Sequence, residues 1–449
     1  MTARSDYDVV IVGGGVTGTA VLHVLSHYTN VQRIALVEKY GRVATVNSHP
    51  RNNSQTLHFG DIETNYTLEH ALPVQDAARL MMNYVLTHPE PGLYRLTSKL
   101  VLAVGAEEVA AMTARYHEFK THYPNLELLG RDELAEREPA VVAGRPADEP
   151  VAALLSRDGY AINYQLLSES FLQAALGSGR QVDTFFDTEV DGIARRTDDT
   201  FVVDTAAGEL RARTVVVAAG PYSLLFAQAL GYAQELAMLP VAGSFYFSNQ
   251  QLLRGKVYTV QTPQLPFAAV HGDPDVVDTD HTRFGPTAKV IPLLERHHYQ
   301  SVRPFLRTPV MTIAGLLTLI GIMRSRVIAG FILRNLFYDL PVVGKWLYLR
   351  QVRKIVPATR WRDIRLGRGL GGLRPQIINT RERTMQMGES KLIERGIIFN
   401  TTPSPGASVS LKNAETDVRA LVGFLGEGFV FDQAAFDRDL RLGSGQAAA

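Results

Sequence analysis

The sequence predicts an α/β protein in which a doubly wound parallel sheet is joined to a second domain with a mixed sheet. Three observations support this: an apolar run that ends in a glycine turn near the N-terminus, a second apolar run that ends in an acidic residue, and a length of 449 residues. A single core rarely grows to that length, so two domains are expected. The hydrophobic fraction of 46% and the charged fraction of 20% exclude general disorder.

The first strand, turn and helix are predicted near the N-terminus. DVVIV at residues 8–12 is a short β-branched run, and GGGVTG follows it before a helical stretch at residues 19–26. Gly13 permits the tight turn, Gly15 lets a pyrophosphate approach the backbone, and Gly18 lets helix and strand pack closely. The helix N-terminus adds free N–H groups and the positive end of its dipole. The pattern predicts a Rossmann-like dinucleotide site.

The second strand, Arg33–Val37, ends in Glu38. Its carboxylate is placed to accept hydrogen bonds from the adenosine ribose of FAD or NAD. It would repel a 2′-phosphate, which disfavours NADP. The residues of this region leave the choice between FAD and NAD open.

Two later strand, loop and helix units are predicted far along the chain. Strands at 181–190, 201–205 and 214–218 close in the turn AAGPYS, and a strand at 396–400 leads through TTPSPGASVS into a helix at 411–425. Taken singly, each unit is also compatible with an ordinary strand–loop–helix junction that binds no ligand. Together with the first motif they favour one binding domain assembled from separated pieces, as in the D-amino-acid-oxidase-like flavoproteins that the AAGPYS turn resembles.

Four stretches carry a closer resemblance. KYGRVATVNSHPRNNSQTLHFGDIETNYTLEHA, VHGDPDVVDTDHTRFGPTAKVIP, GGLRPQIIN and IIFNTTPSPGASVSLKNAE together resemble malate:quinone oxidoreductase, a family of membrane-associated FAD enzymes that oxidise L-malate and reduce quinone. The resemblance spans most of the chain and is closer to the shorter form of that family. It implies a flavin-dependent oxidoreductase acting on CH–OH donors. It also implies a division of the chain into an FAD-binding domain (1–90, 150–232 and 368–440), a mixed-sheet α+β substrate domain (91–149 and 233–367) and a disordered tail (441–449).

The resemblance also implies cofactor contacts beyond the first motif. The polar run NNSQTLHFGDIETNY, which composition alone would favour as a solvated loop, becomes a platform for flavin and substrate. Gln55 and His58 are expected to face the substrate. A strand placed like Glu189-Val190 touches the adenine, and the late Pro/Gly loop faces the flavin pyrimidine. The implied FAD contacts outside the first motif are Asn53, Ser54, Gln55, Thr56, Val190, Ala219, Gly220, Pro405, Gly406, Ala407 and Ser408.

Oxidation of a 2-hydroxy acid requires a base, a hydride acceptor and cations for the carboxylates. With the resemblance, His271 in AAVHGDPD is the predicted base, although a given histidine among twelve is more often structural. Arg374 in GGLRP and Arg283 in TRFGP are predicted to hold the carboxylates, because a guanidinium matches them bidentately. Arg283 is equally compatible with a surface ion pair. Lys289 and Tyr258 are weaker candidates for the pocket wall.

Other chemistries find little support. The chain has no cysteine, and no metal site is expected, because His23 and His27 share a helix face without a carboxylate companion. FAD is expected to be noncovalent, since no cysteine and no well-placed histidine is available for attachment. The N-terminus lacks the continuous apolar region of a signal peptide, which predicts a cytoplasmic protein.

A basic apolar segment is predicted to face the membrane at about residues 305–360. Residues 301–370 hold 13 Lys and Arg against two acidic residues, and sixteen uncharged residues, TPVMTIAGLLTLIGIM, lie between two arginines. Sixteen is short for a membrane span. The pattern favours helices on the inner face of the cell membrane, where anionic headgroups and quinone are found. The alternative is a buried core helix; nucleic-acid binding is disfavoured, because Leu, Ile and Val interleave the basic residues.

The predicted reaction is oxidation of L-malate to oxaloacetate, with hydride transfer to flavin N5 and electrons passed to membrane quinone. One alternative is an L-2-hydroxyglutarate, or other L-2-hydroxy acid, dehydrogenase, since one extra methylene distinguishes the substrates. The other is a membrane-surface flavoprotein that relays or senses electrons. The sequence leaves the quinone species and the oligomeric state undetermined.

Overall fold

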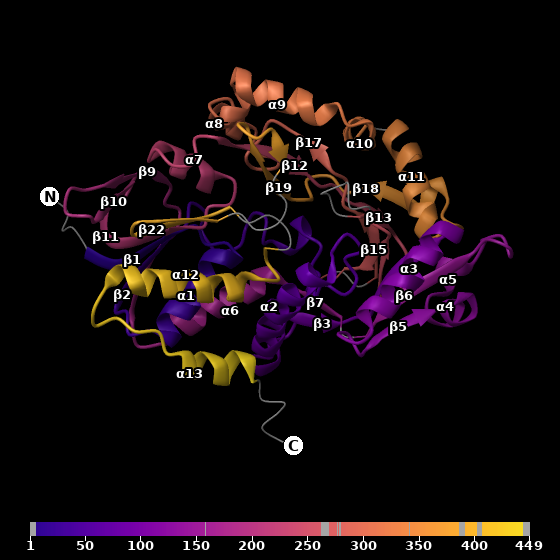
Figure 1. Ribbon diagram of the computed structural model, residues 1–449, viewed down its shortest axis with the longest axis horizontal. Helices are drawn as coiled ribbons and strands as arrows, with labels where there is room; N and C mark the ends of the chain where they lie inside the picture. The colour runs from indigo at the N-terminus through magenta and orange to yellow at the C-terminus, as the bar shows by residue number, and fades with distance from the viewer. Residues whose placement is uncertain are drawn as a thin grey trace.

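The computed structural model describes residues 6–157, 159–261, 269–275, 277, 280–340, 342–385, 391–401 and 406–442. Figure 1 shows a sheet and its covering helices on one side and two further sheets on the other. The fold is the predicted α/β arrangement of a Rossmann-like domain and a mixed-sheet α+β domain.

The first sheet brings the three predicted pieces together. Its main path is β21-β22-β11-β1-β2-β8, and β10 and β9 continue from β11 as an antiparallel extension. β1 pairs in parallel with β2 and β11, β2 with β8, and β11 with β22, which confirms the parallel core. The strands are β1 Asp6–Val12, β2 Arg33–Val37, β8 Gln181–Phe185, β9 Val190–Arg195, β10 Phe201–Thr205, β11 Gly208–Val217, β21 Lys391–Glu394 and β22 Ile397–Asn400.

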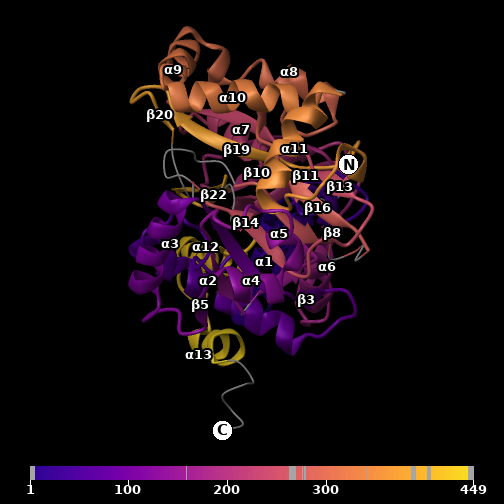
Figure 2. The ribbon, with the colours of Figure 1, turned by 90° about the vertical axis from the view of Figure 1, so that its right-hand side faces the viewer.

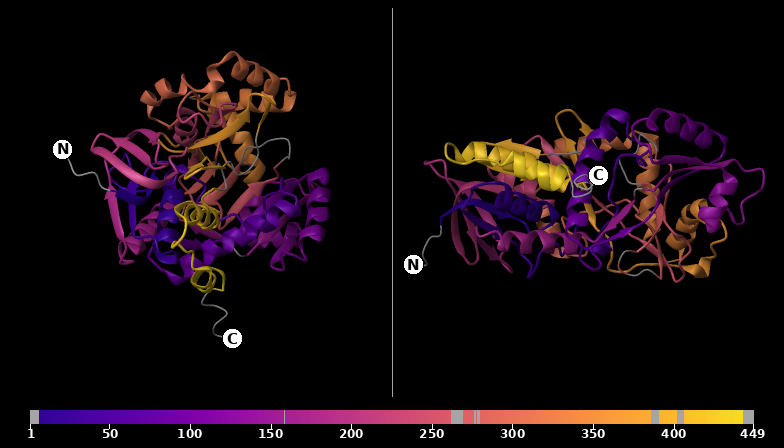
Figure 3. Two further views of the ribbon diagram at one scale, coloured as in Figure 1. Left: turned by 60° about the vertical axis from the view of Figure 1, so that its left-hand side comes forward. Right: turned by 90° about the horizontal axis from the view of Figure 1, so that it is seen from below.

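Helices from three parts of the chain cover one face of this sheet. α1 packs against both α6 and α12, and Figures 1 and 3 show them on the same side of the sheet. Their apolar side chains form one core, and burial of each large aliphatic or aromatic group contributes about 1.5–3 kcal/mol. The helices that accompany the first sheet are α1 Val16–Tyr28, α2 Leu68–Thr87, α6 Tyr164–Leu176, α7 Tyr222–Ala229, α12 Ser410–Leu425 and α13 Gln433–Phe436.

The second and third sheets form the other side of the molecule. The four-stranded sheet has the order β17-β12-β19-β20, and the eight-stranded sheet has the order β18-β13-β16-β15-β14-β4-β6-β5. β3 Tyr94–Leu96 and β7 Tyr160–Ile162 make a separate pair. The other strands are β4 Lys99–Val104, β5 Leu126–Leu129, β6 Val151–Ser156, β12 Leu236–Ala242, β13 Tyr246–Ser248, β14 Lys256–Thr259, β15 His271–Pro274, β16 Thr282–Gly285, β17 Lys289–Val290, β18 Ile364–Leu366, β19 Leu373–Asn379 and β20 Thr384–Met385.

Strand pairing departs from the predicted domain limits. β3, within the predicted piece 91–149, pairs with β7, within 150–232. β6 falls within the predicted piece 150–232 but pairs with β4 and β5, and β19 falls within 368–440 but pairs with β12. Pairing between distant strands is set by tertiary packing, and none of these segments carries a local signal of its partner.

The remaining helices accompany the second and third sheets. They are α3 Ala106–Phe119, α4 Arg131–Arg137, α5 Pro139–Val142, α8 Val302–Phe305, α9 Ile313–Met323, α10 Arg326–Tyr338 and α11 Val343–Ile355. α3 and α11 pack against the eight-stranded sheet. Figures 1 and 2 show α8 to α11 in a row at the opposite end of the molecule from α13.

α9 is a surface helix. Ile313 is 79% exposed and Ile320 is 57% exposed, while only Gly315 and Thr318 of this helix are buried. The alternative of a buried core helix is therefore wrong for this segment. Within the described ranges no single helix is long and apolar enough to span a membrane, whereas α9 and α10, bent by 100° at their junction, reach that length and composition together.

Candidate active site

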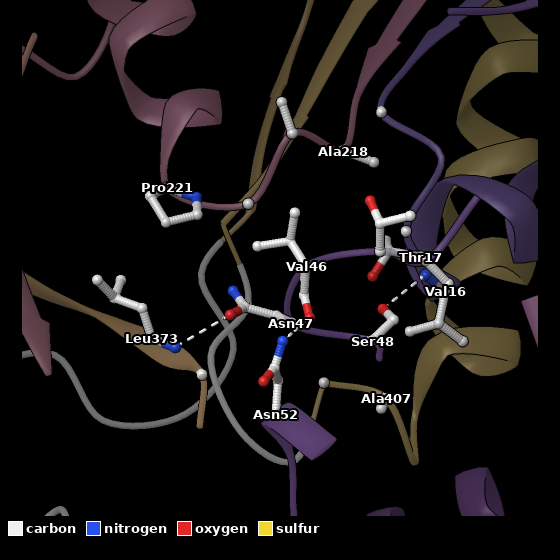
Figure 4. Close-up of a pocket in the computed structure, with 18 of the residues that line it drawn as sticks. Val16, Thr17, Val46, Asn47, Ser48, Asn52, Ala218, Pro221, Leu373 and Ala407 are labelled. Carbon is white, nitrogen blue, oxygen red and sulfur yellow. Dashed lines mark hydrogen bonds between the residues drawn. The ribbon is translucent and has the colours of Figure 1, made fainter. Parts of the chain in front are cut away.

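One cavity of about 320 Å³ opens where the three pieces of the first sheet meet the four-stranded sheet. Its wall includes the N-terminal side of α1, the polar segment before α2, the AAGPYS turn, the start of β19 and the residues before α12. Figure 4 shows these pieces facing one another, with Val16, Asn47, Pro221, Leu373 and Ala407 around the same space.

The glycine turn at the start of α1 has little room for side chains. Gly13 has φ +106°, and a Cβ placed there would lie 2.5 Å from the carbonyl oxygen of Ala218. A Cβ on Gly18 would lie 2.0 Å from the carbonyl oxygen of Gly13, so Gly18 allows the close packing of helix and strand instead of lining the cavity. Gly15 does line the cavity, and a Cβ there would fill space beside Ser48. The turn therefore forms a backbone cradle.

Glu38 lies in the cavity wall with both carboxylate oxygens held by backbone. Its Oε2 accepts from the Gly14 N–H at 2.6 Å and its Oε1 from the Tyr40 N–H at 3.0 Å. Burial raises the pKa of this carboxyl group, although the two N–H donors oppose the shift. Its contact with a ribose stays a prediction.

The later predicted cofactor contacts also reach the cavity. Val190, Ala219 and Gly220 line it from the region of β9 and the turn after β11, and Gly406, Ala407 and Ser408 line it just before α12 begins at Ser410. Pro405 lies outside the described residues.

The polar segment is divided between the cavity and the interior. Asn53, Ser54, Thr56 and His58 line the cavity, but Gln55 does not. Gln55 is fully buried at φ +57°, and its amide donates to the carbonyl of Pro50 at 3.0 Å and to Asp275 at 3.2 Å. The left-handed backbone turns this one side chain away from its neighbours, so the structure does not place Gln55 against a ligand.

Residues just before this segment hold the turn that leads into β19. Oδ1 of Asn47 accepts from the Leu373 N–H at 3.0 Å (Figure 4). Oδ1 of Asn52 accepts from the Gly371 N–H at 3.2 Å. Asn47 and Ser48 were not among the predicted site residues, and Ser48 Oγ accepts from the Val16 N–H at 3.0 Å. Residues 47–56 are rich in amide and hydroxyl side chains, and this composition could have indicated that Asn47 and Ser48 belong to the site.

Arg374 is the predicted carboxylate-binding residue that does line the cavity. Among the described residues Arg374 has no carboxylate within ion-pair distance. Burial lowers the pKa of this guanidinium to about 10, which leaves it charged at neutral pH. An unneutralised cation in a cavity is suited to an anionic ligand.

His58 faces the cavity with one ring nitrogen held by a buried carboxylate. Its Nδ1 is hydrogen-bonded to Glu63, and its backbone N–H donates to Ser408 at 3.0 Å. Burial alone would raise the pKa of Glu63, but its interactions with His58 and Lys99 lower it, so the carboxylate is ionised at neutral pH. A ring that donates from Nδ1 presents Nε2 as a proton acceptor.

His271 and Arg283 do not line the cavity. Both are buried, with Arg283 Nη2 at 2.7 Å from Asp273 Oδ2 and His271 Nε2 at 3.2 Å from Asp273 Oδ1. Tyr258 stands in front of His271, with ring centroids 4.6 Å apart, and shares a 2.5 Å hydrogen bond with Thr56. These two residues therefore lie behind the wall, because β15 and β16 direct them toward an internal carboxylate.

Lys289 also lies away from the cavity wall. Its Nζ is 3.8 Å from a carboxylate oxygen of Asp339, at the end of α10. In the part of the chain that the structure describes, no group of three or more His, Asp or Glu residues is arranged around a common metal position.

Comparison with known proteins decides the family. The FAD dependent oxidoreductase family matches residues 8–411. A malate:quinone oxidoreductase of Helicobacter pylori is 38% identical over 448 residues, covering 97% of this chain and 98% of that protein. The chain belongs to the malate:quinone oxidoreductase family. A probable malate:quinone oxidoreductase of Campylobacter jejuni is likewise 38% identical over 442 residues, covering 96% of this chain and 98% of that protein.

Solved structures agree on the fold. Dithionite-reduced L-α-glycerophosphate oxidase from Mycoplasma pneumoniae with FAD bound superposes with a TM-score of 0.66 at 19% identity, over 93% of this chain and 95% of that one. The match to the FAD dependent oxidoreductase family, together with the malate:quinone oxidoreductase relatives, shows that FAD is the cofactor of this family member. The cavity fits it: Gly15 leaves open space at the start of α1, and no side chain of its N-cap residue closes that helix end.

Proposed function

We propose that this protein oxidises L-malate to oxaloacetate and passes the electrons through FAD to membrane quinone. The observation that carries the proposal is one cavity lined by Arg374, which has no carboxylate partner among the described residues, and by His58, whose ring is held by Glu63. A 2-hydroxy dicarboxylate needs both features, a cation for a carboxylate and a base for the hydroxyl proton.

Arg374 would bind a substrate carboxylate. Its position is fixed by β19 on one side and by the contacts of Asn47 and Asn52 with the preceding turn on the other. A guanidinium offers paired N–H donors, so it both attracts and orients a carboxylate.

His58 would take the hydroxyl proton at Nε2. Glu63 orients the ring through Nδ1 and stabilises the imidazolium that forms, because its own carboxylate stays ionised. The role of base therefore passes from the predicted His271 to His58, which is the histidine in the cavity wall. Bound FAD supplies the acceptor for the hydride that leaves the substrate carbon.

The cofactor would lie along the predicted contacts that line the cavity. Gly13 and Gly15 offer backbone to the pyrophosphate, Glu38 the ribose contact, and Val190 the adenine contact. Ala219 and Gly220 flank the same cavity, and Gly406, Ala407 and Ser408 bring the N-terminal end of α12 toward the flavin.

The decisive test is anaerobic reduction of the purified yellow protein. We expect L-malate to bleach the visible flavin absorption and to yield oxaloacetate, and D-malate to leave the spectrum unchanged. Bleaching by L-2-hydroxyglutarate but not by L-malate would assign the alternative substrate. A spectrum unchanged by either acid would refute the oxidation of a 2-hydroxy acid and favour an electron relay.

The row of α9 to α11 supports docking on the inner face of the cell membrane. Apolar side chains project from it, including Ile313 at 79% exposed and Trp346 at 52% exposed. Exposed arginines flank these side chains: Arg307, Arg324, Arg326, Arg334 and Arg350. An apolar face with a basic rim matches an anionic lipid surface, where the electron acceptor is dissolved.

Binding to lipid vesicles tests this surface. We expect co-sedimentation with vesicles containing phosphatidylglycerol and little with phosphatidylcholine alone. The double substitution Ile313→Glu/Ile320→Glu should lower the partition coefficient at least about tenfold. Leu96→Glu, at a side chain 65% exposed in β3, is the matched control and should bind as the unaltered protein does. Equal binding by both variants would exclude α9 as the docking surface.

A further inference from the structure

A fully buried group of charges lies behind the cavity wall. Lys256 of β14, Asp273 of β15 and Arg283 of β16 are inaccessible to solvent and meet at one carboxylate oxygen. Asp273 Oδ2 is 2.7 Å from Arg283 Nη2 and 3.5 Å from Lys256 Nζ. We call these three residues the charge cluster. Desolvation of buried charges costs free energy, so a group of buried charges suggests that these residues have a specific role.

The free donors of the charge cluster hold backbone carbonyls of the polar segment. Lys256 Nζ donates to the Ser54 carbonyl at 2.8 Å, and Arg283 Nη2 donates to the same oxygen at 3.3 Å. Arg283 Nη1 donates to the Asn53 carbonyl at 3.2 Å and to the Pro50 carbonyl at 3.4 Å. Asn53 and Ser54 belong to the cavity wall, so the cluster holds the backbone of that wall from the interior side.

The segment that the charge cluster holds has an unfavourable backbone conformation at one residue. Gln55 follows Ser54 directly and has φ +57°, a left-handed backbone that is unfavourable for residues with a side chain by about 1–3 kcal/mol. Its N–H donates to Asn53 Oδ1 at 2.8 Å, which closes the turn. Such strain persists only where the surrounding structure fixes it.

We propose that Lys256, Asp273 and Arg283 are positioning residues that hold residues 50–56 in the shape that lines the FAD cavity. They act through the Ser54 and Asn53 carbonyls without touching the cofactor, and thereby set its affinity and its electronic environment. The inference rests on the proposed placement of FAD in this cavity and is independent of which acid is oxidised.

The charges of the cluster allow it to hold the backbone carbonyls of residues 50–56. The cations of Lys256 and Arg283 hold the pKa of Asp273 below its ordinary range, although burial alone would raise it. The carboxylate therefore stays ionised and keeps both cations in place. Neutral hydrogen bonds to the same carbonyls would be weaker, because charged donors bind roughly twice as strongly.

The test compares Arg283→Met and Lys256→Met with Arg145→Met. Arg145 is a matched control, because its guanidinium is also nearly buried and donates to backbone carbonyls, those of Val141 and Lys354, outside the cavity. The readouts are the dissociation constant of FAD, the flavin absorption spectrum and the flavin midpoint potential. None of them uses malate, so a failure of malate to bleach the wild-type flavin leaves this test intact.

We expect Arg283→Met and Lys256→Met to weaken FAD binding roughly 10- to 100-fold and to shift the spectrum and the midpoint potential. Arg283→Lys, which keeps a cation, should recover part of the affinity. Arg145→Met should lower thermal stability while leaving all three flavin readouts unchanged. A cluster variant that loses stability as Arg145→Met does, with unchanged flavin readouts, would overturn the proposal.

A charge-balanced double variant distinguishes a specific loss of FAD binding from general unfolding of the protein. Asp273→Asn/Arg283→Met removes one carboxylate and one guanidinium together, so the net charge of the interior is unchanged and Lys256 and Asp275 remain as opposite charges. We expect a folded protein with weakened FAD affinity. A folded double variant that binds FAD as the unaltered protein does would also overturn the proposal.

Discussion

Arg374 and His58 lie in one cavity wall but are held in different ways. Arg374 is positioned through its backbone, by β19 and by the turn that Asn47 holds. His58 is positioned through its ring, by the carboxylate of Glu63. Substitutions at the two positions should therefore separate substrate binding from chemistry.

Replacement of Arg374 by Met should mainly weaken binding. A charge-assisted hydrogen bond to a carboxylate contributes about 1.5–3 kcal/mol, so the dissociation constant of oxaloacetate should rise roughly 10- to 100-fold. The constant can be measured from the change in flavin absorption on titration with oxaloacetate. Arg365→Met, at an exposed position of β18, is the control. Unchanged affinity in Arg374→Met would remove this residue from the substrate site.

Replacement of His58 by Gln should mainly slow the chemistry. Loss of a general base lowers the rate by roughly 10²- to 10⁴-fold, which stopped-flow measurement of anaerobic flavin reduction by L-malate would detect. His271→Gln should have a much smaller effect on this rate, because His271 is buried behind Tyr258. The reverse ranking of the two variants would restore His271 as the base.

The ionisation of Asp273 should make the free energy of unfolding depend on pH in the acid range. Its folded pKa is lowered below the ordinary 3.8 by Arg283 and Lys256, so the unfolded chain binds more protons as the pH falls below about 4. The stabilisation is complete above that pH and is lost as the pH falls toward the folded pKa. At pH 7, Asp273→Asn should cost about 3–5 kcal/mol, because Lys256 loses its carboxylate partner and Arg283 keeps only Asp275, at 3.5 Å.

Urea unfolding at several pH values checks this expectation. The stability difference between the wild type and Asp273→Asn should narrow on acidification below about pH 4. A difference that stays constant from pH 7 to pH 3 would show that Asp273 is not linked to protonation in this way.

At the level of elements, the β1–α1 turn is limited by backbone contacts. Gly13→Ala would place a Cβ 2.5 Å from the Ala218 carbonyl, whereas Gly105→Ala, at a similar φ of +90°, would meet nothing within 4 Å. We expect Gly105→Ala to lose about 1–2 kcal/mol from backbone strain alone. Gly13→Ala should lose more and also bind FAD poorly, as fluorescence titration would show; equal FAD affinity in both variants would contradict this.

The bent α9–α10 pair follows from its two caps. Thr312 Oγ1 accepts from the Gly315 N–H at 3.2 Å at the start of α9, and Ser325 Oγ accepts from the Ile328 N–H at 3.4 Å at the start of α10. Each cap begins a new helix, so the apolar run is divided into two segments. An exposed apolar pair of this length is suited to lie along a lipid surface.

At the scale of the whole molecule, we propose that the docking surface and the cavity are parts of one route for electrons. Ile313→Glu/Ile320→Glu should raise the KM for a quinone embedded in phosphatidylglycerol vesicles by about tenfold, since it weakens attachment to the membrane. Reduction of a water-soluble dye should be unaffected, because α9 contributes nothing to the cavity wall. An equal loss with both acceptors would contradict separate roles for surface and cavity.

The sequence predicted those parts of the site that depend on local order. Gly13, Gly15 and Glu38 follow one another across a strand, turn and strand, and their positions could be predicted because neighbours in sequence fix them. Arg374 lies in a motif whose turn can be recognised. The placement of β6 and β19 could not be predicted, because their partner strands are distant in the chain.

The two candidate histidines also show which features the sequence predicts and which only the fold decides. His58 and His271 both stand in polar, glycine-containing stretches, and composition does not distinguish them. Only the pairing of β15 with β16 turns His271 toward Asp273, and only the fold brings Glu63 to the ring of His58.

By itself the sequence determined the fold class, the dinucleotide turn, the family and the basic apolar segment, because each is written in short-range spacing or composition. The tertiary structure alone decided which charged groups face the cavity and which neutralise one another behind it. The reason is physical: a carboxylate and a cation more than a hundred residues apart, or on adjacent strands, interact only at the distance that packing sets, and that distance separates the open Arg374 from the paired Arg283.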